Sequence, residues 1–167
     1  MGMLACYIEA DKELLNSLKK KNSEDLLDEI EELENEEDLD IFELDKMWDG
    51  LHCLLTGSSA TTPMENNLLS EAIIGTNTFS EDEEDFIAYI YPDRLAKIVR
   101  ALEQIKIDDL SNNYSSKDFD KKDIYPSIWL EEDEDEIREE LLSCFQDLKE
   151  FYRAVIDKNK GIIISIY

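Results

Sequence analysis

Residues 44–60 read LDKMWDGLHCLLTGSSA and hold the only histidine of the chain. On a helical wheel that starts at Leu44, the large apolar side chains of this segment share one arc: Leu44, Met47, Trp48, Leu51, Leu54 and Leu55. Such an arc predicts a helix over about residues 45–56 that packs against the core. Gly50 borders the arc, where its missing side chain lets another element approach closely, and Gly57 is a typical C-terminal glycine.

A second, polar cluster on the same wheel consists of Asp45, Asp49 and His52. In a functional interpretation, a carboxylate orients the imidazole and raises its pKa, as a general base or metal ligand requires, and Ser58 or Ser59 supplies a hydroxyl nucleophile. In a structural interpretation, Asp45 caps the helix, Asp49 pairs with His52, and the ring donates a hydrogen bond to a neighbouring loop. The candidate catalytic residues are therefore His52, Asp49, Asp45 and Ser59, although a lone histidine at a core boundary is more often structural.

The motifs of several common sites are missing from the sequence. The serines fit no Gly-x-Ser-x-Gly elbow, the five glycines form no phosphate-binding loop, and the acidic runs lack the spacing of an EF-hand. One histidine without a CxxC pair does not make a zinc site. We therefore expect neither a cofactor nor a metal.

Working outward from this segment, hydrophobic periodicity predicts helices and strands along the whole chain. The predicted strands cover residues 3–10, 86–91 and 162–167, with the last apolar on both faces and therefore central. Other predicted helices cover 11–20, 23 to before 39, 62–75 from a Thr-Pro-Met-Glu capping box, 92–104 and 131–159. Residues 81–85 read as a solvated loop, 106–123 as polar short turns, and 124–126 and 128–130 as extended anchors. The pattern indicates one α+β domain over residues 1–167, with a small mixed sheet that includes both terminal strands and several packed helices.

Charge is the unusual property of the composition. The chain has 42 acidic and 17 basic residues, for a formal net charge of −25. Such a field repels nucleic acid and anionic membrane surfaces, and it attracts a basic partner. Three widely spaced cysteines, no secretory signal and no apolar run long enough to span a bilayer predict a cytoplasmic protein.

A set of short motifs along the chain resembles one known family. They are Met1-Gly2-Met3, Leu44-Asp45-Lys46, Trp48-Asp49, Leu51-His52, Leu54 with Thr56-Gly57 and Ser59, Leu69-Ser70 with Ala72 and Gly75, and Ile124-Tyr125-Pro126. The sequence resembles the bacterial YfbM-like family, a domain of unknown function, although Leu68 stands where proline is expected and the acidic runs are denser. The resemblance implies a compact α+β domain and no known catalytic residues.

Two functional hypotheses follow, and the sequence does not decide between them. The first is a non-catalytic acidic protein that binds a basic protein, in the manner of a toxin-neutralising immunity protein or a DNA mimic. The alternative is a small cytosolic enzyme or ligand-binding domain centred on His52. The second hypothesis requires the ring of His52 to serve a cleft, whereas a purely structural role requires only a backbone carbonyl as its partner.

Overall fold

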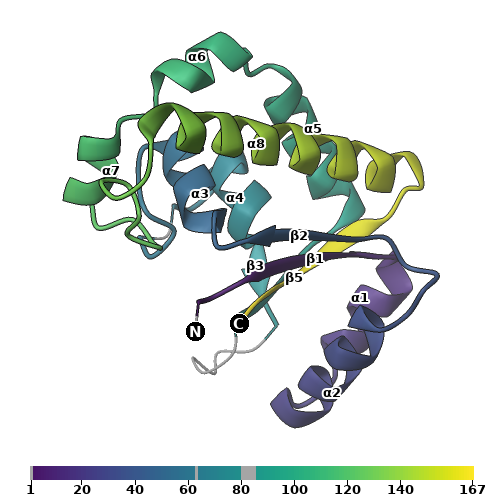
Figure 1. Cartoon of the computed structure of the whole chain (residues 1–167). Helices are drawn as coiled ribbons and strands as arrows, with labels where there is room; N and C mark the ends of the chain where they lie inside the picture. The colour runs from purple at the N-terminus through teal and green to yellow at the C-terminus, as the bar shows by residue number, and fades with distance from the viewer. Residues whose placement is uncertain (1, 63, 80–85) are drawn as a thin grey trace.

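A computed structural model describes residues 2–62, 64–79 and 86–167, and their fold is α+β, as predicted (Figure 1). The strands are β1 (Ala5–Ala10), β2 (Ile41–Asp45), β3 (Asn77–Thr78), β4 (Phe86–Ile90) and β5 (Gly161–Ile166). They form one sheet in the order β2-β1-β5-β4-β3, and every pairing between them is antiparallel. The predicted central position of the last strand is confirmed, but the sheet is antiparallel rather than mixed.

The helices of the described part cover the two faces of this sheet. They are α1 (Lys12–Leu18), α2 (Ser23–Glu34), α3 (Trp48–Thr56), α4 (Leu68–Ile74), α5 (Pro92–Glu103), α6 (Ile107–Asn112), α7 (Ser116–Lys121) and α8 (Glu134–Asp157). Figure 1 shows α3, α4, α5 and α8 on one side of the sheet and α1 with α2 on the other. Two hydrophobic clusters correspond to these layers, the larger one under α8 and the smaller one under α1 and α2.

The long helix α8 has the predicted apolar seam, although it is shorter at both ends than the predicted range 131–159. Its buried residues are Ile137, Leu141, Phe145, Leu148, Tyr152 and Val155, which is the seam that the periodicity predicted. The hydroxyl of Tyr152 donates to the carbonyl of Ala72 at 2.6 Å, and the hydroxyl of Tyr7 in β1 donates to the carbonyl of Ile73 at 2.8 Å. These two buried bonds hold α4 between the sheet and α8.

The prediction of a helix from residue 45 was wrong at its start. Residues 41–45 form the edge strand β2, and α3 begins only at Trp48 after Met47, which makes no side-chain capping bond. Phe42 of β2 packs its ring on Tyr7 and stacks on Phe151 at 5.6 Å between centroids. Pairing with β1 and burial of this ring favour the strand over the local helical pattern.

Other segments also differ from the prediction. The helix predicted from residue 62 begins at Leu68, where the side chain of Asn67 accepts from the backbone of Leu69 and Ser70, while Pro63 lies outside the described residues. The predicted loop 81–85 also lies outside them. Within 106–123 the chain forms α6 and α7 rather than only turns, and residues 124–130 form turns rather than extended anchors.

Candidate functional site

His52 lies in the middle of α3 and is fully buried, at 0% exposure. Its Nδ1 lies 2.7 Å from the carbonyl oxygen of Ser58, and its Nε2 lies 2.7 Å from Oγ of Ser70. A carbonyl oxygen only accepts, so Nδ1 carries the proton, and Nε2 accepts the hydroxyl proton of Ser70. The ring therefore connects α3 to the loop that follows it and to α4.

The pKa of His52 is lowered from its ordinary value because burial disfavours the charged ring. The hydrogen bond to Ser58 and the charge of Asp49 act in the opposite direction and only partly offset this effect. The ring is thus neutral at neutral pH, with a lone pair on Nε2 directed at a serine hydroxyl.

Asp49 does not pair with His52, which corrects the predicted pairing of these two residues. Its buried carboxylate accepts from the hydroxyl of Ser59 at 3.0 Å, from the backbone N–H of Ala60 at 2.7 Å and from the backbone N–H of Tyr125 at 2.9 Å. Three donors from two loops thus meet on one carboxylate. Its role in this geometry is to join α3 to these loops.

The remaining candidates offer no hydroxyl or carboxylate to the imidazole. Ser58 contributes its carbonyl rather than its hydroxyl, and the hydroxyl of Ser59 bonds Asp49 and Thr61. Asp45 ends β2 with a positive φ of 51° and does not cap α3. The structure therefore separates His52 from Asp45 and brings in Ser70, which lies 18 residues along the chain. Ser70 belongs to one of the motifs of the family resemblance, but nothing in the sequence linked it to His52.

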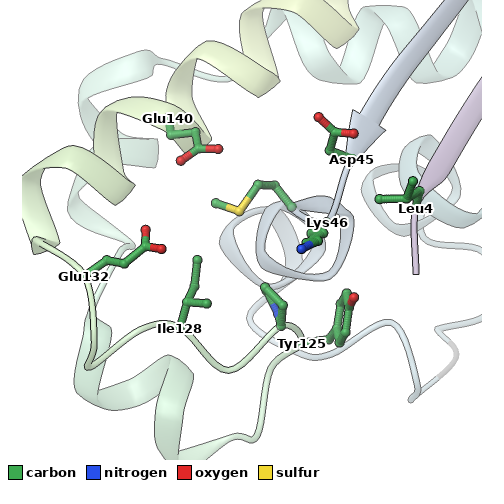
Figure 2. Close-up of a pocket in the computed structure, with 9 residues that line it drawn as sticks. Leu4, Asp45, Lys46, Tyr125, Ile128, Glu132 and Glu140 are labelled. Atoms are coloured by element: carbon green, nitrogen blue, oxygen red, sulfur yellow. The ribbon is translucent and has the colours of Figure 1, made fainter. Parts of the chain in front are cut away.

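Asp45 belongs instead to an open pocket of about 580 Å³ (Figure 2). The pocket is lined by Leu4, Asp45, Lys46, Met47, Tyr125, Pro126, Ile128, Glu132 and Glu140. Its wall combines three carboxylates with one lysine, and the rest is mainly apolar. The pKa of Glu140 is raised, first by burial and then by the negative charges of Glu132 and Asp45 in the same pocket.

Two further observations concern metal ligands and membrane-spanning helices in the described part of the chain. No group of three or more His, Cys, Asp or Glu side chains there is placed to hold a metal ion. Within the same residues, no helix has the length and apolar character needed to cross a bilayer.

The fold and these sites define an acidic α+β protein with a buried histidine centre and an acidic pocket. The family described as "Domain of unknown function (DUF1877)" matches residues 1–165, so the chain belongs to this family. It is 30% identical to Protein YfbM of Escherichia coli (strain K12) over 168 residues, which cover 99% of each chain. It also shares the fold of a crystal structure of YfbM from Escherichia coli, a protein of unknown function, with a TM-score of 0.79 and 24% identity over 98% of this chain and 99% of that one. The resemblance to the YfbM-like family is confirmed.

Proposed function

We propose that this protein binds a basic protein partner through an acidic strip on its surface, as a toxin-neutralising immunity protein or a DNA mimic would. The strip is defined by Glu31, Glu34, Glu43, Asp45, Glu132 and Glu140. Burial and the charges of Glu31 and Glu43 raise the pKa of Glu34, while burial, Glu132 and Asp45 raise that of Glu140. Because Glu43 and Asp45 are two residues apart on β2, this edge strand connects the acidic end of α2 to the acidic start of α8.

The observation that carries the proposal is that these carboxylates repel one another without being neutralised by an ion pair, although Lys46 lines the pocket with three of them. None of the six forms an ion pair with another described residue, whereas Glu9, Glu71 and Glu103 each do. Five of the six side chains are exposed and Glu34 is half-buried. Like charges held in this way favour a ligand that brings positive charge.

The pocket of Figure 2 gives the strip a place for a single cationic side chain. Three carboxylates, of Asp45, Glu132 and Glu140, outnumber the single cation of Lys46 in its lining, and the rest of the wall is mainly apolar. A lysine or arginine carries an apolar stem below its charged head, so both parts of the side chain meet a matching surface. We expect the partner to insert such a residue here.

Binding of a short oligo-arginine peptide, measured by calorimetry at low and high salt, tests the strip with a defined probe. Replacing Glu34, Glu43 and Glu140 with glutamine should weaken binding about tenfold, since each exposed ion pair contributes roughly 0.5 kcal/mol. The matched control replaces three exposed acidic residues outside the strip, by Glu13→Gln, Asp108→Asn and Glu150→Gln. Its net charge equals that of the strip variant. Equal weakening in both variants would show that only net charge matters and would refute the strip.

The natural partner can then be sought by affinity capture from bacterial lysate at low salt, with elution by high salt. The proposal requires a basic protein that the wild-type chain retains and the strip variant loses. Retention of no basic protein at low salt would contradict it. A cytoplasmic location is also part of the proposal, supported by the three free thiols, Cys6, Cys53 and Cys144.

A further inference from the structure

A second pocket, of about 510 Å³, lies beside α4 and β3, away from the acidic strip. Its lining includes Met64, Ser70, Glu71, Thr76, Asn77 and Arg94. Glu71 and Arg94 form an ion pair in which Nε of Arg94 donates to the carboxylate at 2.8 Å. These two charges offset each other, and the exposed Glu65 in the same lining adds one negative charge, so this pocket disfavours an anion and suits a ligand without a negative charge.

Ser70 and His52 meet the geometric requirements of a nucleophile and its base. The hydroxyl of Ser70 donates to Nε2 of His52 at 2.7 Å, and Nδ1–H of the ring donates to the carbonyl of Ser58 at 2.7 Å. The carbonyl fixes the tautomer and the ring orientation, which is the part that a carboxylate plays in a catalytic triad. The neutral state of the buried ring is also the state that a general base needs.

An independent observation in the same pocket points to a ligand. Oγ1 of Thr76 is buried and has no hydrogen-bond partner among the described residues. A buried hydroxyl without a partner costs free energy, and a ligand oxygen that accepts its proton would remove that cost. Thr76 lines the same pocket as Ser70, and its hydroxyl becomes a donor to a ligand when local opening exposes it.

We propose that Ser70 and His52 form a nucleophile–base pair serving this pocket, with a small uncharged acyl ester as the class of substrate and Thr76 as a donor to it. Oγ of Ser70 bonds to the acyl carbon while Nε2 of His52 takes its proton. The bond from that carbon to the alcohol oxygen breaks, and the proton passes to the leaving alcohol. Water then attacks the acyl-serine, gives a proton to Nε2 and releases the acid, and the proton returns to Ser70. The small size follows from the pocket volume of about 510 Å³, and because Ser70 is only 1% exposed and His52 is fully buried, the attack requires local opening of the chain beside α4.

The test uses a small alkyl fluorophosphonate, which forms an oxygen–phosphorus bond with an activated serine and loses fluoride. The full-length wild-type protein should be labelled, and mass spectrometry of its peptides should place the label on Ser70. Mapping on the wild-type chain does not depend on the folding of any variant. Absence of labelling, or a label on another residue, would overturn the proposal.

Variants then separate a chemical role from a structural one. Ser70→Ala should abolish the label, and His52→Gln should slow labelling by roughly 100-fold or more, the usual contribution of a general base. Thr76→Val should slow it about tenfold. Ser143→Ala, an exposed change on α8, is the control that keeps the wild-type rate.

The labelling rate should fall at acidic pH with a midpoint below about 6.5, because protonated His52 accepts no proton. Labelling that is unchanged in His52→Gln, or the same at all pH values, would contradict the assigned base.

Discussion

At the scale of single residues, Gly50 shows how a missing side chain decides a contact. A Cβ at this position would lie 2.5 Å from Cη2 of Trp129 and 3.3 Å from Cδ2 of Leu141. The Trp129 ring is buried and held by a hydrogen bond of 2.7 Å from its Nε1 to the carbonyl of Ile124, so it has little freedom to move. The close approach expected at Gly50 from the sequence is confirmed, but its partner was not predictable.

Gly50→Ala should therefore destabilise the protein, although alanine is the better helix former. The clash with Trp129 is expected to cost about 1–3 kcal/mol, more than the gain of about 1 kcal/mol in helix propensity. Urea denaturation measures the change. Trp129→Phe in the same chain should relieve part of it, and Ala154→Gly, at an exposed site of α8, measures helix propensity without a clash. A Gly50→Ala protein that is more stable than the wild type would show that the Trp129 ring moves to make room for the added Cβ.

At the scale of elements, Asp49 explains how α3 positions the loops beside it. Its carboxylate binds Ser59 and Ala60 of one loop and Tyr125 of another, which are far apart in the sequence. An aspartate next to a histidine on a helical wheel favours a pairing on that helix. The wheel contains no information about backbone N–H groups that arrive from elsewhere, and here those groups take both carboxylate oxygens.

Asp49→Asn should cost on the order of 3 kcal/mol, because its amide group would face a backbone N–H donor at one of the two oxygens. The free energy of unfolding in urea gives the magnitude, and hydrogen exchange should show faster exchange at Ala60 and Tyr125. Asp45→Asn is the matched control: Asp45 is exposed, and asparagine tolerates its positive φ. We expect a change within about 0.5 kcal/mol there. Equal effects of the two substitutions would refute the role of Asp49.

At the scale of the whole molecule, the proposed binding of a basic partner to the acidic strip should depend on pH. Glu34 and Glu140 have pKa values above the ordinary carboxylate value, and a cationic partner favours their ionised forms. Glu34 and Glu140 therefore have higher pKa values in the free protein than in the complex. At pH values between these, the free protein holds more protons than the complex. Binding releases protons in this window, and the affinity rises with pH until both groups are ionised in the free protein.

Calorimetry with the oligo-arginine peptide in two buffers of different ionisation enthalpy should detect this release at about pH 5 and none at about pH 8. The variant with glutamine at Glu34, Glu43 and Glu140 should release fewer protons at the lower pH than the matched control variant. Equal release from the two variants would place the coupled carboxylates outside the strip.

The sequence by itself determined the elements whose signals are local. The apolar seam of α8, the buried run of β5 and the proline at the start of α5 each act within one element, where side-chain spacing, burial and a fixed φ decide the conformation. Only the tertiary structure decided that residues 41–45 are a strand, since that depends on pairing with β1 and on contact with Phe151 of α8. The same holds for the partner of His52. Its neighbour Ser70 comes from another helix, and no periodicity along the chain records which groups meet when two helices pack.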